Sequence, residues 1–253
     1  MPLEILPLSI LDLSVLGFFL ISWIGYARFA KLMAVRRKTL SSVMRIHRED
    51  WMRRVLSHEN RIADVALLGN LERVVTFFAS TTLLILAGIL TAISATEGTI
   101  SILASLPWSR PTSPADLQIK ILVMALVFIY AFFKFTWSIR QYNFCSVLVG
   151  GAPNEKHEEI NQQGLELFSA RAAKLIDLAG HDFNSGLRAY YFALALLLWL
   201  VNPWAFVFAT LWVVLVLYRR EFHSRALKTL SESLEYKTLL EPDGPNKRDH
   251  HAQ

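Results

Sequence analysis

Residues 134 to 150, KFTWSIRQYNFCSVLVG, place charged, amide and aromatic side chains directly after a long apolar run. The side chains that can form ion pairs or hydrogen bonds include Lys134, Trp137, Arg140, Gln141 and Asn143. Lys134, Trp137 and Gln141 share one face of a helix, because residues three, four and seven apart are neighbours on its surface. Ammonium, guanidinium and amide groups gathered at one depth either bind an anion or hold neighbouring helices together.

Lys134 stands near the inner end of an apolar run that begins at Ile119. About 20 helical residues cross the roughly 30 Å hydrocarbon core of a bilayer, so the run from Ile119 to Ile139 predicts a spanning helix. An unrelieved charge at this depth costs roughly 2.5 to 3.5 kcal/mol. Either Lys134 faces the helix bundle or a wet cavity, or its alkyl stem carries the ammonium to the membrane surface.

A second set of polar residues follows one side of the preceding apolar segment. Asn70, Arg73, Ser80 and Thr81 project from the same side of a helix, with large apolar residues elsewhere around it. A stripe of small and polar residues is either a tight seam between helices or the lining of a water path.

Two acidic residues lie close to this stripe in the sequence. Glu72 points away from Arg73 and lies at the end of the segment where Lys134 should also arrive. A carboxylate within reach relieves the charge of a lysine or arginine at that depth. We therefore expect Glu72 or Asp64 to lie beside Lys134 or Arg140.

The composition restricts the class of protein. The chain has 253 residues, 53% of them hydrophobic, with a mean hydropathy of +0.36, and its apolar residues are clustered into long runs. Such clustering is typical of an integral membrane protein. The formal net charge of +5 is accompanied by no DNA- or RNA-binding pattern, so the expected partner is the lipid bilayer and not a nucleic acid.

No motif indicates catalysis or a bound group. His157-Glu158-Glu159 and His181-Asp182 are short and have no second ligand cluster, and the sequence contains no glycine-rich phosphate loop. Cys145 is the single cysteine, which excludes an intrachain disulfide and a cysteine-cluster metal site. We expect no enzyme, no cofactor and no metal site.

The apolar runs predict an all-α membrane protein with about five membrane segments, three full spans followed by a C-terminal helical hairpin. Amphipathic helices on the cytoplasmic side are expected between and after the spans. A single helical membrane domain covers 1–240, with a disordered tail at 241–253. The membrane segments lie at about 9–32, 72–95, 119–139, 187–201 and 203–218, and the cytoplasmic helices at about 39–68 and 155–179.

Glycine, proline and asparagine predict where helices end. Gly180 should stop the helix 155–179, and 97–118 should be an external loop. Asn202-Pro203 is a good N-cap and N1 pair, which favours a new helix there and hence a hairpin. One straight helix over 189–218 would be about 45 Å long and remains the alternative.

The distribution of basic residues predicts the orientation. Residues 28–73 hold eleven Lys and Arg, the loop 97–118 holds one, 140–188 hold five and 219–253 hold seven. Because cytoplasmic loops are enriched in Lys and Arg, we expect a multi-pass protein of the cell (inner) membrane with its N-terminus outside and its C-terminus cytoplasmic.

Three phrases carry a resemblance to a known family: HENRIADVALLGNLERVVTFFAST, FTWSIRQYNFCSVLVGGAP and FNSGLRAYYFALALLLWLVNPW. They resemble an uncharacterised family of bacterial and plant integral membrane proteins that is catalogued as a domain of unknown function. The resemblance extends from about Asp12 to Leu230. It implies a membrane location and supplies no site residues.

Two classes of function follow from these residues. The first is a non-enzymatic structural, assembly or interaction protein, whose polar residues join helices and whose cytoplasmic helices dock an unidentified membrane or cytoplasmic protein. The alternative is a small homo-oligomeric channel or transporter for an anion, because basic residues combined with hydroxyls suit anions. The two classes differ in whether Arg73, Lys134 and Arg140 are paired inside a dry bundle or line a wet path.

Overall fold

The computed structural model describes residues 8–106, 108–153 and 161–240, with side chains as far as residue 234. Within these ranges the chain forms helices and no strand. The helices are α1 (Ile10–Arg36), α2 (Leu40–Ser57), α3 (Ile62–Ser94), α4 (Thr96–Ala104), α5 (Pro114–Gly150), α6 (Gln162–Trp199), α7 (Pro203–Phe222) and α8 (Arg225–Leu240).

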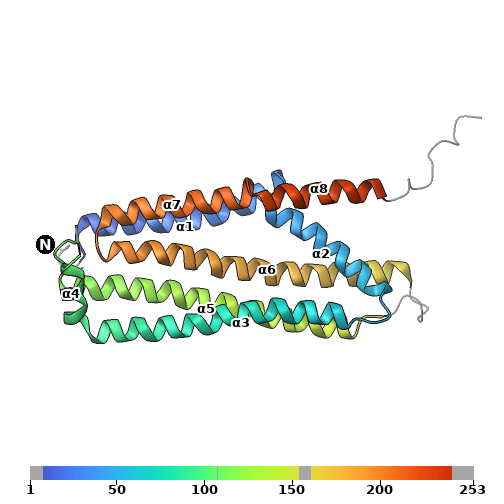
Figure 1. The fold of residues 1–253 in the computed structure, drawn as a ribbon, viewed down its shortest axis with the longest axis horizontal. Helices are drawn as coiled ribbons and strands as arrows, with labels where there is room; N and C mark the ends of the chain where they lie inside the picture. Colours follow the sequence, from blue (N-terminus) through green and yellow to red (C-terminus); the bar gives the residue numbers. More distant parts are fainter. Residues whose placement is uncertain (1–7, 107, 154–160, 241–253) are drawn as a thin grey trace, which may run out of the picture.

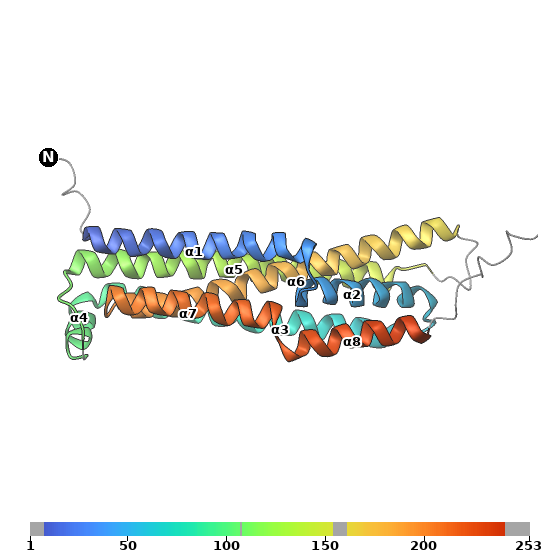
Figure 2. The ribbon, with the colours of Figure 1, turned by 90° about the horizontal axis from the view of Figure 1, so that it is seen from above.

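Three long helices, α3, α5 and α6, run side by side along the whole molecule (Figure 1). Helices α1 and α7 contact each other and flank one half, at whose tip α4 lies. Helices α2 and α8 contact each other in the other half, as Figure 2 shows from above. We call the first tip the α4 end and the opposite half the α8 half.

Helices α1, α3 and α5 are long and apolar enough to cross a membrane, which agrees with the three predicted full spans. Helix α5 has 37 residues. At 1.5 Å per residue it is about 55 Å long, well beyond a hydrocarbon core of roughly 30 Å. The predicted span at 119–139 is therefore one part of a longer helix that continues without a break to Gly150.

Local capping sets several helix starts. The side chains of Ser9 and Ser113 accept hydrogen bonds from the backbone N–H groups of Asp12 and Asp116, at the first turns of α1 and α5. Asn202 caps α7 in the same way, and Pro203 follows as its first residue. The break predicted at Asn202-Pro203 is confirmed, and a single helix over 189–218 is excluded.

The helix predicted at 39–68 is in fact two helices. Helix α2 ends at Ser57, and α3 begins at Ile62, whose backbone N–H is held by the side chain of Asn60. The Arg61 guanidinium donates to the carbonyls of Ala152 and Pro153, the latter at 2.8 Å. These bonds fix the turn that sends the chain into the span.

Gly180 does not stop a helix, because α6 runs from Gln162 to Trp199 without interruption. A Cβ atom at Gly180 would lie 2.7 Å from Nη2 of Arg48, so the glycine makes room for this side chain from α2. The predicted loop at 97–118 contains α4. The tail at 241–253 lies outside the described residues, as does the start of the helix predicted at 155–179.

Aromatic rings fill the core of the half that contains α1 and α7. Phe19 packs against Phe192 and Phe206, with ring centroids 5.7 and 5.2 Å apart. Phe135 packs 5.6 Å from Tyr190. Outward-facing positions on the same helices carry exposed apolar side chains, as a lipid-facing surface requires. Examples are Ile21, Leu84, Leu122, Leu194 and Phe208.

Candidate functional site

Lys134 is paired inside the bundle with a residue of α6. Its Nζ donates to Oδ1 of Asp182 at 2.7 Å, and Nε2 of Gln141 donates to Oδ2 of the same carboxylate at 2.9 Å. Asp182 and Gln141 are buried, while a third of the Lys134 side chain is exposed. The buried carboxylate therefore receives a charge-assisted bond and an amide bond.

Further contacts extend this junction between α5 and α6. The hydroxyl of Ser138 donates to the carbonyl oxygen of Ala179 at 2.8 Å, and both groups are buried. Nζ of Lys134 also lies 5.9 Å from the ring centroid of Tyr130. One helical face of α5 thus presents Lys134, Ser138 and Gln141 to α6, which fixes the register of the two helices.

The prediction that Glu72 or Asp64 lies beside Lys134 or Arg140 is wrong. Glu72 accepts instead from Nδ2 of Asn143 at 3.2 Å. Asp64 accepts from Nε1 of Trp51 at 2.7 Å and pairs with Nδ1 of His58 at 2.8 Å. Both carboxylates join α3 to neighbouring segments of the chain. The carboxylate that pairs with Lys134 belongs to α6, far from Lys134 in the sequence.

The remaining predicted residues face outward. Asn70, Arg73 and Ser80 are exposed on α3, and the Thr81 hydroxyl donates to the backbone carbonyl of Phe77. Because this stripe faces away from the bundle, it forms no seam with another helix of the part of the chain that the structure describes.

Trp137 and Arg140 border a shallow groove on the outside of α5. The groove has a volume of about 410 Å³, and the guanidinium of Arg140 lies 5.7 Å from the ring centroid of Phe144. Its walls are mostly apolar, apart from the cationic groups at one side. It is lined by Tyr130, Phe133, Lys134, Thr136, Trp137 and Arg140.

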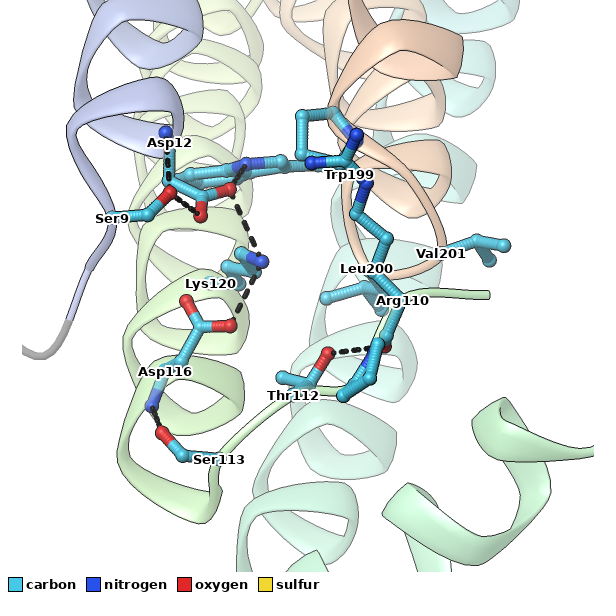
Figure 3. A pocket seen from close by; sticks show the side chains of 12 residues that line it. Ser9, Asp12, Arg110, Thr112, Ser113, Asp116, Lys120, Trp199, Leu200 and Val201 are labelled. Carbon is cyan, nitrogen blue, oxygen red and sulfur yellow. Dashed lines mark hydrogen bonds and ion pairs between the residues drawn. The ribbon is translucent and has the colours of Figure 1, made fainter. Parts of the chain in front are cut away.

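A second charged cluster lies near the α4 end, where sequence analysis identified no site (Figure 3). Nζ of Lys120 lies 3.0 Å from Oδ2 of Asp116 on its own helix and 3.2 Å from Oδ1 of Asp12 on α1. Nε1 of Trp199 donates to Asp12 at 2.8 Å, and Lys120 lies 5.5 Å from the Trp199 ring centroid. These residues join α1, α5 and α6.

The signal for this cluster was present in the sequence. Asp116 and Lys120 are four residues apart, which places them on one helical face, and Asp12 is the only acidic residue of the first apolar run. An acid and a base at this spacing at the start of an apolar helix predict a charge pair that needs burial or a partner. What the spacing could not show is that Asp12 and Trp199 complete it.

The chemistry open to these groups is hydrogen bonding and charge pairing. Among the described residues, no group of three or more His, Cys, Asp and Glu side chains is placed to hold a metal ion. Cys145 on α5 is buried. Its thiol is therefore poorly accessible to reagents.

Comparison with known proteins gives a family and no activity. The model of a family described as "Protein of unknown function, DUF599" matches residues 14–226, which is most of the chain. The match contains Lys120, Lys134 and Asp182 and begins just after Asp12. No curated protein and no solved structure matches the chain.

Proposed function

The chain belongs to the DUF599 family of proteins of unknown function, and from this premise we propose that it is a non-enzymatic structural or interaction protein of a membrane. Its apolar helices anchor it in the bilayer, and α3, α5 and α6 continue without a break into the α8 half. That half is the part that contacts other proteins.

The observation that carries the proposal is the pairing of Lys134 with Asp182. This ion pair, with Gln141 beside it, uses polar groups near the inner end of the α5 span to hold α6. Arg73 and Arg140, the two other cations that the sequence singles out, are exposed. Polar side chains used in this way join helices, as they do in many membrane bundles.

For the topology we propose five crossings of the cell (inner) membrane, with the N-terminus outside and the C-terminus in the cytoplasm. The exposed apolar side chains of α6 and α7 support the fourth and fifth crossings, since they would otherwise face water. Those of α7 are Trp204, Phe208, Leu211, Trp212, Leu215 and Val216. The basic residues at the inner ends of α1 and α7 support the orientation.

The α8 half supports an interaction role. Helix α5 continues past Lys134 to Gly150, which is about 24 Å at 1.5 Å per residue. On this half, apolar side chains remain exposed on three helices, which a protein partner would cover. They are Ile62, Leu67, Phe144, Val147 and Leu167. A cytoplasmic protein or a second copy of the chain is the partner that we propose.

One observation favours the second candidate, an oligomeric channel or transporter for a small anion. The stripe on α3 that contains Arg73 and Ser80 faces outward, where a neighbouring copy could pack against it. An anion path lined by these groups would then lie between copies and not within one chain. Basic and hydroxyl groups are the lining that such a path needs.

Anion flux distinguishes the two candidates. Purified protein in sealed liposomes would be tested with chloride or nitrate against potassium, for the wild type, Lys134→Leu and Arg140→Leu. If the role is structural, vesicles with any of the three proteins should lose the anion no faster than protein-free vesicles. An added ionophore should then release the gradient, which shows that the vesicles are sealed. Selective anion flux in the wild type that Arg140→Leu abolishes, with the variant still inserted and folded, would replace our proposal by the channel.

A further inference from the structure

A cavity of about 280 Å³ opens beside the buried cluster at the α4 end (Figure 3). Its inner wall is formed by Asp12, Asp116, Lys120 and Trp199. Its rim is formed by the connection between α4 and α5, including Arg110, and by the turn between α6 and α7. The cavity is independent of the Lys134 junction, and the inference below does not rest on the proposed function.

The bonds within the cluster leave one acceptor unused. Both oxygens of Asp12 are bonded, Oδ2 to the Ser9 hydroxyl at 2.5 Å and Oδ1 to Trp199 and Lys120. Oδ2 of Asp116 receives Lys120. Oδ1 of Asp116 is buried and has no hydrogen-bond donor among the described residues. Buried carboxylate oxygens are normally bonded, because their desolvation is otherwise uncompensated.

The charges of the cluster point to the same missing group. Asp12, Asp116 and Lys120 are 6%, 9% and 4% exposed, so two acids share one buried base. An unbalanced charge away from water is unfavourable unless a counter-charge binds beside it. The cluster therefore has an acceptor without a donor at Oδ1 of Asp116 and, when both acids are ionised, one negative charge without a partner.

We propose that this cavity binds the primary ammonium group of a zwitterionic aminoethyl phosphate, with an N–H of the ammonium donating to Oδ1 of Asp116. The phosphate then lies toward the rim, within reach of Arg110. The exposed Arg110 side chain makes no ion pair with a described residue, and a guanidinium binds phosphate through paired N–H groups. A trimethylated ammonium has no N–H to donate and does not satisfy the site.

This chemistry has two sources, a free aminoethyl phosphate in solution and the head group of phosphatidylethanolamine. The surroundings of the cavity suit the lipid as well as the free compound. Ile10, Leu13 and Trp204 are exposed apolar residues next in sequence to the lining residues Ser9, Asp12 and Pro203. Acyl chains of a lipid held at the cavity would contact such side chains along α1 and α7.

The first arm of the test measures thermal unfolding of the full-length protein in detergent with phosphoethanolamine, phosphocholine or glycerol phosphate. At saturation we expect phosphoethanolamine to raise the Tm of the wild type by about 4 °C or more, and the other two compounds to have little effect. Asp116→Asn should abolish the shift. Arg110→Gln, a change at an exposed residue, should reduce it without loss of folding. Glu97→Gln, an exposed acid on α4 outside the cavity lining, is the matched control and should keep the full shift.

The second arm measures lipid retention by native mass spectrometry after extraction from vesicles of equal phosphatidylethanolamine and phosphatidylglycerol content. Retention of phosphatidylethanolamine by the wild type and Glu97→Gln, but not by Asp116→Asn, identifies the lipid as the source. A Tm shift without lipid retention identifies the free compound. If a stable wild type shows neither, or if Arg110→Gln and Asp116→Asn behave as the wild type does, the proposal is overturned and Oδ1 of Asp116 is bonded to water alone.

Discussion

At the residue scale, the two lysines of α5 that form ion pairs differ in how far they are removed from solvent. The side chain of Lys120 is 5% exposed and lies between two carboxylates, whereas that of Lys134 is 33% exposed and has one. The free energy lost on breaking an ion pair rises with burial, because the abandoned partner is then poorly solvated.

We predict that Lys120→Met lowers the free energy of unfolding more than Lys134→Met. The first change leaves Asp12 and Asp116 facing each other and should cost about 3 to 5 kcal/mol. The second leaves Asp182 bonded to Gln141, beside a Lys134 position that is partly open to solvent, and should cost about 1 to 2 kcal/mol. Equilibrium unfolding in mixed micelles measures both. Equal losses would show that the two pairs are equally solvated, contrary to the structure.

A second prediction concerns the partner of Lys134. If Asp182 is that partner, the effects of Lys134→Met and Asp182→Asn on the free energy of unfolding should not add, with a coupling of about 0.5 to 2 kcal/mol. The pair Lys134→Met and Glu72→Gln, which combines the lysine with its wrongly expected partner, is the control and should be additive. Coupling to Glu72 and none to Asp182 would reverse this assignment.

The sequence identified the polar residues of the junction but not their partners. Lys134 and Gln141 were recognised because each interrupts an apolar face at helical spacing, a signal that depends on neighbours in the chain. Asp182 lies 48 residues from Lys134 along the chain. Periodicity carries no information on contacts between helices that are distant in the sequence, so it cannot identify Asp182 as the partner of Lys134.

At the element scale, two glycines of α6 show why helix boundaries were harder to predict than helices. Gly180 was interpreted as a stop, but it lies under the Arg48 side chain, and Gly186 lies under the ring of Phe135. In both places the glycine permits close approach of a neighbouring side chain within a continuous helix. Local sequence cannot separate this role from termination, because the neighbour comes from another helix.

We predict that Gly186→Ala destabilises the protein by about 1 to 3 kcal/mol, because the new Cβ would overlap the buried Phe135 ring. Phe135→Leu in the same chain should recover part of that loss. Gly88→Ala is the matched control, since a Cβ there meets nothing within 4 Å, and it should be neutral or stabilising by up to about 1 kcal/mol. Thermal unfolding of the four proteins checks this, and a loss of stability in Gly88→Ala but not in Gly186→Ala would contradict the packing of α5 on α6.

At the scale of the whole molecule, the class of fold and the family could be predicted from the sequence. The long apolar runs predict three spans, and the structure contains three helices that are long and apolar enough to cross a membrane. The phrases that resemble a family of unknown function lie within the region that the family model matches. The continuation of α3, α5 and α6 beyond the apolar half was not predicted. In the α8 half these helices mix apolar and polar residues. Such a pattern does not distinguish one long helix from two shorter ones.

In the proposed topology, α5 leaves the bilayer near Lys134 and continues outside it as an unbroken helix. The helix offers exposed positions on both sides of this boundary, so a nitroxide can be placed at each without disturbing the core. Before the boundary these positions are Leu122, Leu126, Ile129 and Phe133, and after it Arg140, Phe144 and Val147.

The most direct test is a spin-label accessibility scan of these positions in lipid vesicles, with buried Cys145 replaced by alanine. We predict that labels at the first four positions collide mainly with oxygen, which concentrates in the hydrocarbon core, and that labels at the last three collide mainly with a water-soluble nickel complex. Phe144 and Val147 make the test stringent, because their side chains are apolar. If labels at those two positions report hydrocarbon, α5 remains in the membrane to its end and the proposed protein-contacting half does not exist.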